Sequence, residues 1–386
     1  FIIATLFIYA GFYVLRQLIK HKKVSHIIRS QELKNIIFCT ALLLITTILF
    51  ITIISGFDRF LSFITGMLWF TQTKVASLQS FWPNVLVTVA EFNPGSIGTI
   101  ISQMGGKLLF FLGLMGVLFI MTVKQEKIEK DQKYIITFGA IIYLLLVSAY
   151  GTALNPKIYM ALIALPVIIG MLVLLKSEKE VDVKLAILLV IWFVATSYAA
   201  LKGVRFTLLM TSAFSVSLGV TIASIYKILS KWISTELKID EIITKSVIVI
   251  LLLLLLIAPV KAGYSVAKGY IPSVNDAWYN SLTKIKDNSQ PDAIINSWWD
   301  FGHWFKYIAD RRVTLDGGRQ SGPPLHWLGK LMVTSDEKRS MGILKMLDCG
   351  SYTAFDELNK VLNDTSKSID ILDLIVTLDK TKAQET

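Results

Sequence analysis

The chain has 386 residues, of which 54% are hydrophobic and only 17% are charged. That apolar share exceeds what one soluble core can bury, which excludes an ordinary soluble globular protein and favours a membrane protein. The net charge of +11 leaves an acidic membrane surface or nucleic acid as candidate partners. The two cysteines, Cys39 and Cys349, lie in different regions and fit neither a disulfide framework nor a thiolate metal site.

Eight segments are apolar enough to cross a bilayer as helices, which takes about 20 residues each. We predict spans at 1–18, 36–56, 107–123, 134–154, 157–175, 184–200, 206–228 and 245–262. The fold class is therefore a polytopic α-helical membrane protein, with a transmembrane domain at 1–262. Because Phe1 lies inside an apolar run without the features of a signal peptide, we expect an amino-terminal part of the protein to precede it.

The cations are distributed unequally between the two sides of the predicted membrane domain. Seventeen lie in one set of alternate loops, at 16–34, 124–133, 176–184 and 227–245. Six lie in the other set, at 57–107, 155–157 and 201–205. The positive-inside rule assigns the first set to the cytoplasm, so the basic charge reflects topology and requires no nucleic-acid partner. The long loop 57–106 and the tail 263–386 are then both extracytoplasmic, and the protein is expected in the cell membrane.

The external loop 57–106 is long for a connection between adjacent spans. Its first half, 57–81, is apolar enough to lie along the membrane surface as an amphipathic helix. Its second half, 82–95, indicates a short extended run followed by a turn, in a loop able to close over a substrate. Glu91 is the only acid between Asp58 and the next span, and a solvated loop carboxylate is the alternative to a functional role.

The composition changes to mixed polar at the start of the tail, where we predict an α-rich soluble domain with a small sheet. We expect helices at 275–287, 300–309, 325–333, 336–348, 352–362 and 365–375, and strands at 293–297 and 312–316. The tail is expected to end within its domain. Three tryptophans and one acid stand together at 298–304, which suits a shaped polar pocket. The alternative is an aromatic-rich core in which Asp300 caps a helix.

Three motifs together carry a family resemblance. Trp298-Trp299-Asp300-Phe301-Gly302 resembles the Trp-Trp-Asp-Tyr-Gly signature of the oligosaccharyltransferase catalytic subunit, with Phe301 in place of the usual tyrosine. Thr88-Val89-Ala90-Glu91 is similar to the Thr-x-x-Glu motif in that family's fifth external loop. Residues 364–371 match its D-x-x-K-x-x-x-I pattern, which favours an archaeal member.

The resemblance implies a glycosyltransferase that moves an oligosaccharide from a polyprenyl phosphate or pyrophosphate carrier to asparagine in Asn-x-Ser/Thr. Trp298, Trp299 and Asp300 would bind the acceptor's Ser or Thr hydroxyl. Lys367 and Ile371, four residues apart on one helix face, would complete that pocket. Asp364 would instead cap the same helix. The acceptor polypeptide, the lipid-linked oligosaccharide and membrane lipids are the expected partners of an enzyme with a single subunit.

By the same resemblance, Glu91 would be the catalytic residue that holds the acceptor amide. Mn²⁺ or Mg²⁺ would stabilise the leaving phosphate, with Glu91 as one ligand and the family's other ligands upstream of Phe1. Residues 1–386 alone are therefore expected to be inactive. Arg205 would contact the carrier phosphate, and an interfacial anchor is its alternative.

Two other functions compete with this one. A transporter would carry charged or broken spans that meet at mid-membrane, whereas these span interiors are nearly free of charge. A related polyprenyl-sugar transferase with a lipid or hydroxyl acceptor would share the topology but would not need a tryptophan–aspartate pocket.

Overall fold

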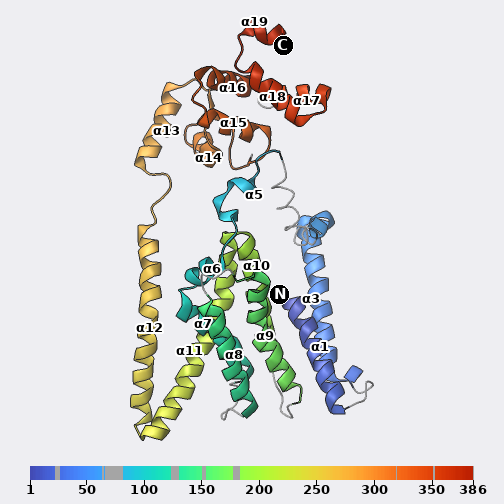
Figure 1. Ribbon diagram of the computed structural model, residues 1–386, viewed down its shortest axis with the longest axis vertical. Coiled ribbons are helices and arrows are strands. Elements are labelled where there is room, and N and C mark those ends of the chain that lie inside the picture. The colour runs from blue at the N-terminus through green and yellow to red at the C-terminus, as the bar shows by residue number, and fades with distance from the viewer. Residues whose placement is uncertain are drawn as a thin grey trace. The chain divides into compact units, whose positions relative to one another are not determined.

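The computed structural model describes residues 1–21, 27–62, 65, 81–122, 130–149, 154–176, 183–318, 320–350 and 353–385 (Figure 1). The chain forms two compact units. The first comprises Phe1–Leu68 and Glu91–Val266, and the second comprises Trp69–Ala90 and Ala267–Thr386. The expected amphipathic helix at 57–81 lies mostly outside the described residues, apart from a helical turn at 57–62.

The first unit is built from long apolar helices. Its helices are α1 (Ile2–His21), α3 (Gln31–Ser55), α6 (Ile97–Gln103), α7 (Lys107–Thr122), α8 (Lys130–Ser148), α9 (Pro156–Leu174), α10 (Lys184–Lys202), α11 (Leu208–Leu237) and α12 (Glu241–Gly269), with 3₁₀ turns η1 (Ala90–Phe92) and η2 (Val204–Thr207). Helices α7 to α11 lie side by side (Figure 1). A core of buried apolar side chains joins them, centred on residues such as Phe110, Leu114, Tyr143 and Phe193.

A helix occupies each of the eight predicted spans, but fewer of these helices qualify as membrane spans within the described residues. Among the described residues, six helices are long and apolar enough, and a seventh counts if α6 and α7 form one span. Those two helices are bent by 87° at a short break that contains Gly105 and Gly106, both with positive φ. The apolar part of α8, Gln132–Ser148, is too short to qualify. Six or seven of the eight predicted spans therefore qualify among the described residues, and the span predicted at 134–154 includes positions outside them.

Helices α7 and α11 pack against each other through small residues. A Cβ at Gly116 would lie 1.8 Å from the carbonyl oxygen of Ser217, so only glycine fits there. The hydroxyls of Ser217 and Thr221 donate across the interface to the carbonyls of Gly113 and Leu112. Small residues and hydroxyl bonds of this kind join helices in membranes, where the hydrophobic effect between helices is absent.

The segment before Glu91 is helical rather than extended. Asn84 caps the short helix α5 (Val85–Thr88), since its side chain accepts a bond from the amide of Leu86 at 3.0 Å. The hydroxyl of Thr88 donates back to the carbonyl of Asn84. The predicted extended run at 82–95 was therefore wrong. β-Branched residues suggested a strand, but local side-chain bonds to the backbone favoured a helical turn.

The second unit contains α13 (Asp276–Asn288), α14 (Trp299–Tyr307), α15 (Pro323–Val333), α16 (Glu337–Gly350), α17 (Thr353–Leu362), α18 (Thr365–Ile375) and α19 (Lys380–Glu385). Strands β1 (Ile294–Ile295) and β2 (Arg312–Val313) pair in parallel, with Ile294 opposite Arg312. The sequence predicted this helical region and its small sheet, to within a few residues at each end. The long helix α12 extends to Gly269, beyond its predicted end.

Two apolar clusters stabilise the second unit. The first, the motif core, consists of Leu315, Leu325, Trp327, Leu328, Ile343, Leu347, Phe355, Ile369 and Leu372. The second, the α13 core, consists of Leu282, Phe305 and Ala309. Arg311 is buried beside the α13 core, where its guanidinium donates to the carbonyls of Lys286 and Ser289 at the end of α13. That arginine satisfies carbonyls that the helix leaves unpaired.

Candidate functional site

Glu91 is carried by the 3₁₀ turn η1, and the chain that follows it is attached to the end of α10 by backbone contacts. The amide of Val204 donates to the carbonyl of Asn93 at 2.9 Å, and the amide of Gly95 donates to the carbonyl of Ala200 at 3.1 Å. A Cβ at Gly95 would lie 2.6 Å from that same carbonyl oxygen, so glycine permits the close approach. These two bonds form a bracket that holds the loop beside η2.

The bracket places Glu91 beside Arg205. Glu91 Oε2 lies 3.7 Å from Arg205 Nη1, and the guanidinium also stacks over the ring of Phe92 at 4.8 Å. The side chains are 67% and 45% exposed, so an ion pair of this kind contributes only about 0–1 kcal/mol. The backbone bracket, rather than the charge pair, therefore positions the loop. The pair leaves both side chains accessible to a ligand.

The two charged groups line one cavity of about 410 Å³ within the first unit. Its other walls come from the α6–α7 break and from the start of α11: Gln103, Met104, Val204, Thr207, Leu208 and Thr211. Glu91 and Arg205 were predicted separately from the sequence, and the structure brings them together. Gln103 and Thr211 were not predicted, because a lone glutamine or threonine beside a turn carries no pattern that a single sequence reveals.

The described residues do not form a metal site. No group of three or more His, Cys, Asp or Glu side chains that could hold an ion occurs among them. The neighbour of Glu91 is a guanidinium, which repels a cation, rather than a second carboxylate. Glu91 as a metal ligand therefore stays a prediction that depends on ligands outside the described residues.

In the second unit, the tryptophan motif opens helix α14. Trp298 is the N-cap residue, in extended conformation, and Asp300 follows in the first turn of the helix. Asp300 is exposed, and it has no hydrogen-bond or ion-pair partner within the described part of the chain. The alternative that Asp300 caps the helix is wrong. Its negative charge near the helix N-terminus is favourable, and its oxygens remain able to accept a bond from a ligand.

The two tryptophans before Asp300 are held by the motif core. Both indoles are half-buried against it, and Trp299 Nε1 is buried without a hydrogen-bond partner among the described residues. Close packing explains why the motif ends in glycine, since a Cβ at Gly302 would lie 2.2 Å from the carbonyl oxygen of Leu315. Helix α14 therefore packs directly on the chain that follows β2. The tryptophans point into one core, while Phe301 and Trp304 pack on Trp278 beside the α13 core.

Beyond Gly302 lies a polar network around Asp316. Lys306 Nζ donates to Asp316 Oδ2 at 2.7 Å, and the amide of Gly318 donates to Oδ1 at 2.8 Å. The hydrogen bond from Lys306 lowers the pKa of Asp316, which is 14% exposed, and the bond from Gly318 lowers it further. Asp316 thus stays ionised and fixes the turn on which α14 packs.

Helix α18 carries the third motif. The side chain of Asp364 accepts a bond from the amide of Lys367 at 3.0 Å, which confirms that Asp364 is the N-cap. Ser368, Ile369 and Leu372 are the buried face, and the latter two belong to the motif core. Lys367 is exposed and Ile371 is half-buried on the remaining surface. The motif core thus contacts both α18 and the two tryptophans, but within the described residues no hydrogen bond or ion pair joins Asp300 to Lys367.

The predicted site residues therefore fall into two groups. Glu91 and Arg205 belong to the first unit, and the tryptophan and lysine motifs belong to the second.

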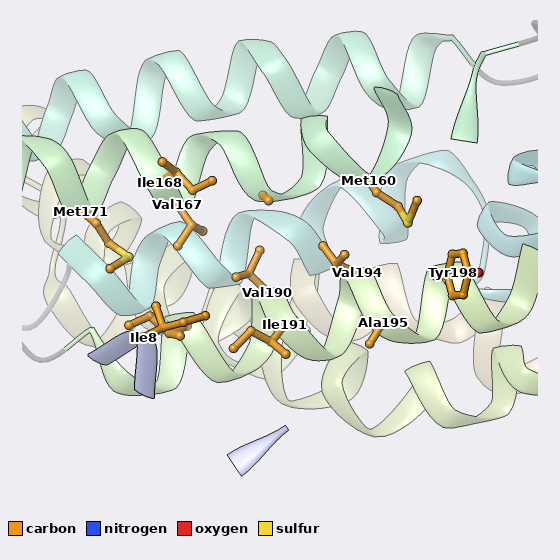
Figure 2. A pocket seen from close by; sticks show the side chains of 12 residues that line it. Ile8, Met160, Val167, Ile168, Met171, Val190, Ile191, Val194, Ala195 and Tyr198 are labelled. Carbon is orange, nitrogen blue, oxygen red and sulfur yellow. The ribbon is translucent and has the colours of Figure 1, made fainter. Parts of the chain in front are cut away.

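An apolar groove of about 490 Å³ lies within the first unit between α1, α9 and α10 (Figure 2). Figure 2 shows Met171 and Ile8 near one end of it and Met160 and Tyr198 near the other. Tyr198 supplies the one polar group among its lining side chains. Lys202 lies over the Tyr198 ring at 5.8 Å, on the last turn of α10 before Arg205.

Comparison with known proteins gives consistent matches. Residues 291–386 match the family model described as the STT3/PglB/AglB core domain. The chain is 29% identical over 387 aligned positions to a dolichyl-phosphooligosaccharide-protein glycotransferase of Methanocaldococcus jannaschii, covering 94% of this chain and 40% of that protein. A protein of the same name from Methanococcus voltae is 27% identical, covering 92% of this chain and 41% of that protein. An undecaprenyl-diphosphooligosaccharide–protein glycotransferase of Campylobacter jejuni is 24% identical over 46% of this chain and 23% of its own length.

The chain is thus a homologue of the archaeal oligosaccharyltransferases, and a multi-pass membrane protein. It spans about 40% of the length of the two archaeal relatives that it matches along most of its own length.

Proposed function

We propose that this homologue of the archaeal oligosaccharyltransferases transfers an oligosaccharide from a polyprenyl phosphate or pyrophosphate carrier to the asparagine of Asn-x-Ser/Thr. The pocket shared by Glu91 and Arg205 carries the proposal. Joining an amide to a sugar phosphate needs an acceptor for amide N–H groups and a cation for the phosphate at the same place. A carboxylate and a guanidinium on one accessible cavity meet both needs.

Glu91 acts on the acceptor. An amide nitrogen is a poor nucleophile, because its lone pair is delocalised into the carbonyl group. A carboxylate that accepts the N–H bonds polarises the amide and makes that lone pair more available. The nitrogen attacks the anomeric carbon with inversion, the carbon–oxygen bond to phosphate breaks, and the phosphate keeps the electron pair. Glu91 accepts the proton that the nitrogen loses, because its carboxylate already accepts the N–H bonds of the amide.

The donor occupies the first unit. Arg205 binds the carrier phosphate, because its fork of N–H donors matches phosphate oxygens in geometry and charge. The apolar groove between α9 and α10 suits the hydrocarbon chain of the carrier, since α10 leads from Tyr198 at the groove's end to η2 and Arg205. A divalent cation, Mn²⁺ or Mg²⁺, would supply further charge to the leaving phosphate. No step assigned to the residues above depends on it.

The second unit recognises the acceptor. Asp300 accepts the bond of the Ser or Thr hydroxyl, and the half-buried indoles of Trp298 and Trp299 fix the start of the helix that carries it. Lys367 and Ile371 extend this surface from α18. An aspartate without a partner of its own is well suited to a hydroxyl donor, whereas a capping aspartate would be committed to its helix. We place this unit on the extracytoplasmic side, from the distribution of cations between the loops.

Transfer by the intact protein in lipid vesicles tests the proposal. A fluorescent Asn-x-Thr peptide and a lipid-linked oligosaccharide are expected to yield a glycopeptide detectable by gel shift and mass. Asp300→Ala is expected to weaken peptide binding at least ~10-fold, as for loss of a hydrogen bond to a charged group. It is also expected to abolish the preference for Asn-x-Thr over Asn-x-Ala.

Asp276→Ala is the matched control, because Asp276 is also an exposed acid in the first turn of a helix, α13. It is expected to bind peptide as the wild type does. Unchanged peptide affinity in Asp300→Ala would refute the acceptor assignment. Transfer to a lipid acceptor but not to the peptide would favour the related sugar transferase, and substrate flux without transfer would favour a transporter.

A further inference from the structure

The loop that carries Glu91 is also anchored in the second unit, at Phe81, Trp82 and Pro83. The ring of Trp82 meets Phe355 edge to face, with centroids 4.8 Å apart, and meets His326 in the same way at 5.7 Å. Phe81 packs on Trp82 at 5.3 Å and on His326 at 6.2 Å. Edge-to-face pairs at these separations are the favoured arrangement of aromatic rings. The rings of Phe81, Trp82, His326 and Phe355 therefore form one packed group. His326 comes from α15 and Phe355 from α17.

A backbone bond strengthens this anchor. The amide of Gly322 donates to the carbonyl of Pro83 at 3.2 Å. Gly322 precedes α15 with φ at +88°, a conformation that residues with a side chain rarely adopt. The turn that presents this amide is therefore specific to glycine at that position. Pro83 has no amide hydrogen of its own, so its carbonyl is the group that the loop offers here.

The anchor connects to Glu91 through a short helix rather than a loose chain. Asn84 follows Pro83 directly and caps α5, which ends at Thr88. The turn η1, with Glu91, begins two residues later. Beyond it, the bracket bonds Asn93 and Gly95 to the end of α10. The described segment from Phe81 to Gly95 is thus bonded near both ends, with one helical turn and one 3₁₀ turn between.

The same motif core holds Trp82 and the two tryptophans beside Asp300. Trp82, Trp298 and Trp299 are all half-buried against it, and Phe355 belongs to it. Protein interiors are close-packed, so a displacement of one of these indoles is felt by its neighbours in the core. The side chains that would bind the acceptor's hydroxyl therefore share a rigid support with the root of the loop that would hold the acceptor's amide.

We propose that Phe81, Trp82 and Pro83 form a clamp that fixes the start of α5, the helix that leads along the chain to Glu91, and that Trp82 is a positioning residue for the transfer reaction. The inference rests on the proposed function. It goes beyond that function because it assigns a role to residues outside all three motifs. The alternative is that Trp82 contributes only to the packing of the motif core.

The experiment compares kcat and peptide affinity in the intact protein reconstituted in lipid vesicles. In Trp82→Ala, kcat for glycopeptide formation is expected to fall at least 10-fold, while the dissociation constant of the Asn-x-Thr peptide changes less than 3-fold. Trp82→Phe keeps an edge-to-face partner for Phe355 and is expected to restore kcat to within 3-fold of wild type. Trp82→Leu keeps apolar volume without the ring and is expected to lie between the two.

Leu282→Ala is the control for lost packing, because Leu282 is fully buried in the α13 core of the same unit. It is expected to lower thermal stability without changing kcat at a temperature where the protein is folded. If Trp82→Ala does not fold, the comparison of Trp82→Leu with Trp82→Phe still decides the question.

Wild-type kcat in Trp82→Ala, or in Trp82→Leu where the alanine variant does not fold, would overturn the clamp. Equal losses of kcat and peptide affinity would do the same, since they indicate general damage to the unit. Either result leaves the proposed function standing as long as the wild-type protein glycosylates the peptide. Failure of the wild type to do so refutes the proposed function itself.

Discussion

Glu91 and Asp300 are both exposed carboxylates at the start of a helical turn, but the structure supports them in different ways. Glu91 is held by backbone bonds to the end of α10 and has Arg205 as a charged neighbour. Asp300 follows two indoles packed in the motif core and has no partner among the described residues. One carboxylate is positioned by its main chain and already meets a cation. The other is positioned by aromatic packing and is open.

This difference separates two tasks. A group that binds a hydroxyl needs a fixed position, which tryptophans packed in a core supply at low conformational cost. A group that acts on an amide beside a phosphate needs a nearby cation and room for two ligands, which an open cavity supplies. Acceptor recognition thus depends on aromatic packing, and transfer depends on main-chain bonds and a charged neighbour. Substitutions at the two places are therefore expected to affect different quantities, peptide affinity in one case and turnover in the other.

The largest effect is expected from Glu91→Gln. The amide keeps the size of the side chain but loses the charge that polarises the acceptor, so turnover is expected to fall at least ~100-fold, as for loss of a positioned acid–base group. Peptide affinity is expected to remain within about 3-fold, because the hydroxyl is read elsewhere. Single-turnover transfer and peptide binding by fluorescence anisotropy measure the two quantities. A loss of peptide affinity as large as the loss of turnover would contradict the separate roles proposed for the two carboxylates.

The support of Asp300 is tested by Gly302→Ala. The new methyl group would lie 2.2 Å from the carbonyl oxygen of Leu315, so α14 must move away from the chain after β2. Overpacking of this kind costs about 1–3 kcal/mol of unfolding free energy, and it is expected to weaken peptide binding as well. Denaturant unfolding and peptide titration are the measurements.

Gly329→Ala is the control for that experiment. A Cβ at Gly329 meets only the far edge of the Trp298 ring, at 3.9 Å, and the position lies inside helix α15. It is expected to be neutral or stabilising, by up to ~1 kcal/mol, because alanine favours helix over glycine. Equal behaviour of the two variants would show that Gly302 is not a packing requirement of the motif.

The sequence predicted the regions of the fold well where the signal is local. Apolar runs predicted the position of each membrane helix, and Asp364 was expected to cap α18 as it does. Helix α7 begins at Lys107, where its span was predicted to begin, directly after the bend at Gly105 and Gly106. The segment at 82–95 failed because Asn84 and Thr88 bond to the local backbone, which outweighs the strand preference of its valines.

Contacts between distant parts of the chain could not be predicted. Nothing in a single sequence indicates that Val204 bonds to Asn93, so the meeting of Glu91 with Arg205 had no local signal. The same holds for Trp82, which packs on residues more than two hundred positions later.

The smallest effect is expected from pH, which changes the stability of the second unit through His326. This residue packs on Phe81 and Trp82, where the loop that carries Glu91 is anchored. Half-burial of His326 among Phe81, Trp82 and Trp327 lowers its pKa from 6.5 by desolvation, and Lys330 lowers it further, while Asp373 raises it. The unfolded chain binds this proton more readily than the folded chain. The unfolding free energy of the second unit is therefore expected to be independent of His326 above pH 6.5 and to decrease as pH falls below that value.

His326→Phe removes the titration while keeping an aromatic ring against Trp82. Thermal unfolding of wild type and variant between pH 7.5 and 5 is expected to show a decline in the wild type that is smaller in the variant, and the difference isolates His326 from other titrating groups. His326 Nε2 is buried without a partner among the described residues, so a proton there gains no acceptor in the folded state. A thermal unfolding midpoint that rises toward pH 5 in the wild type relative to the variant would contradict the expected direction of the pH effect. The bracket at Asn93 and Gly95 is made only of backbone bonds, so acid is expected to loosen the Trp82 end of the loop before the Arg205 end.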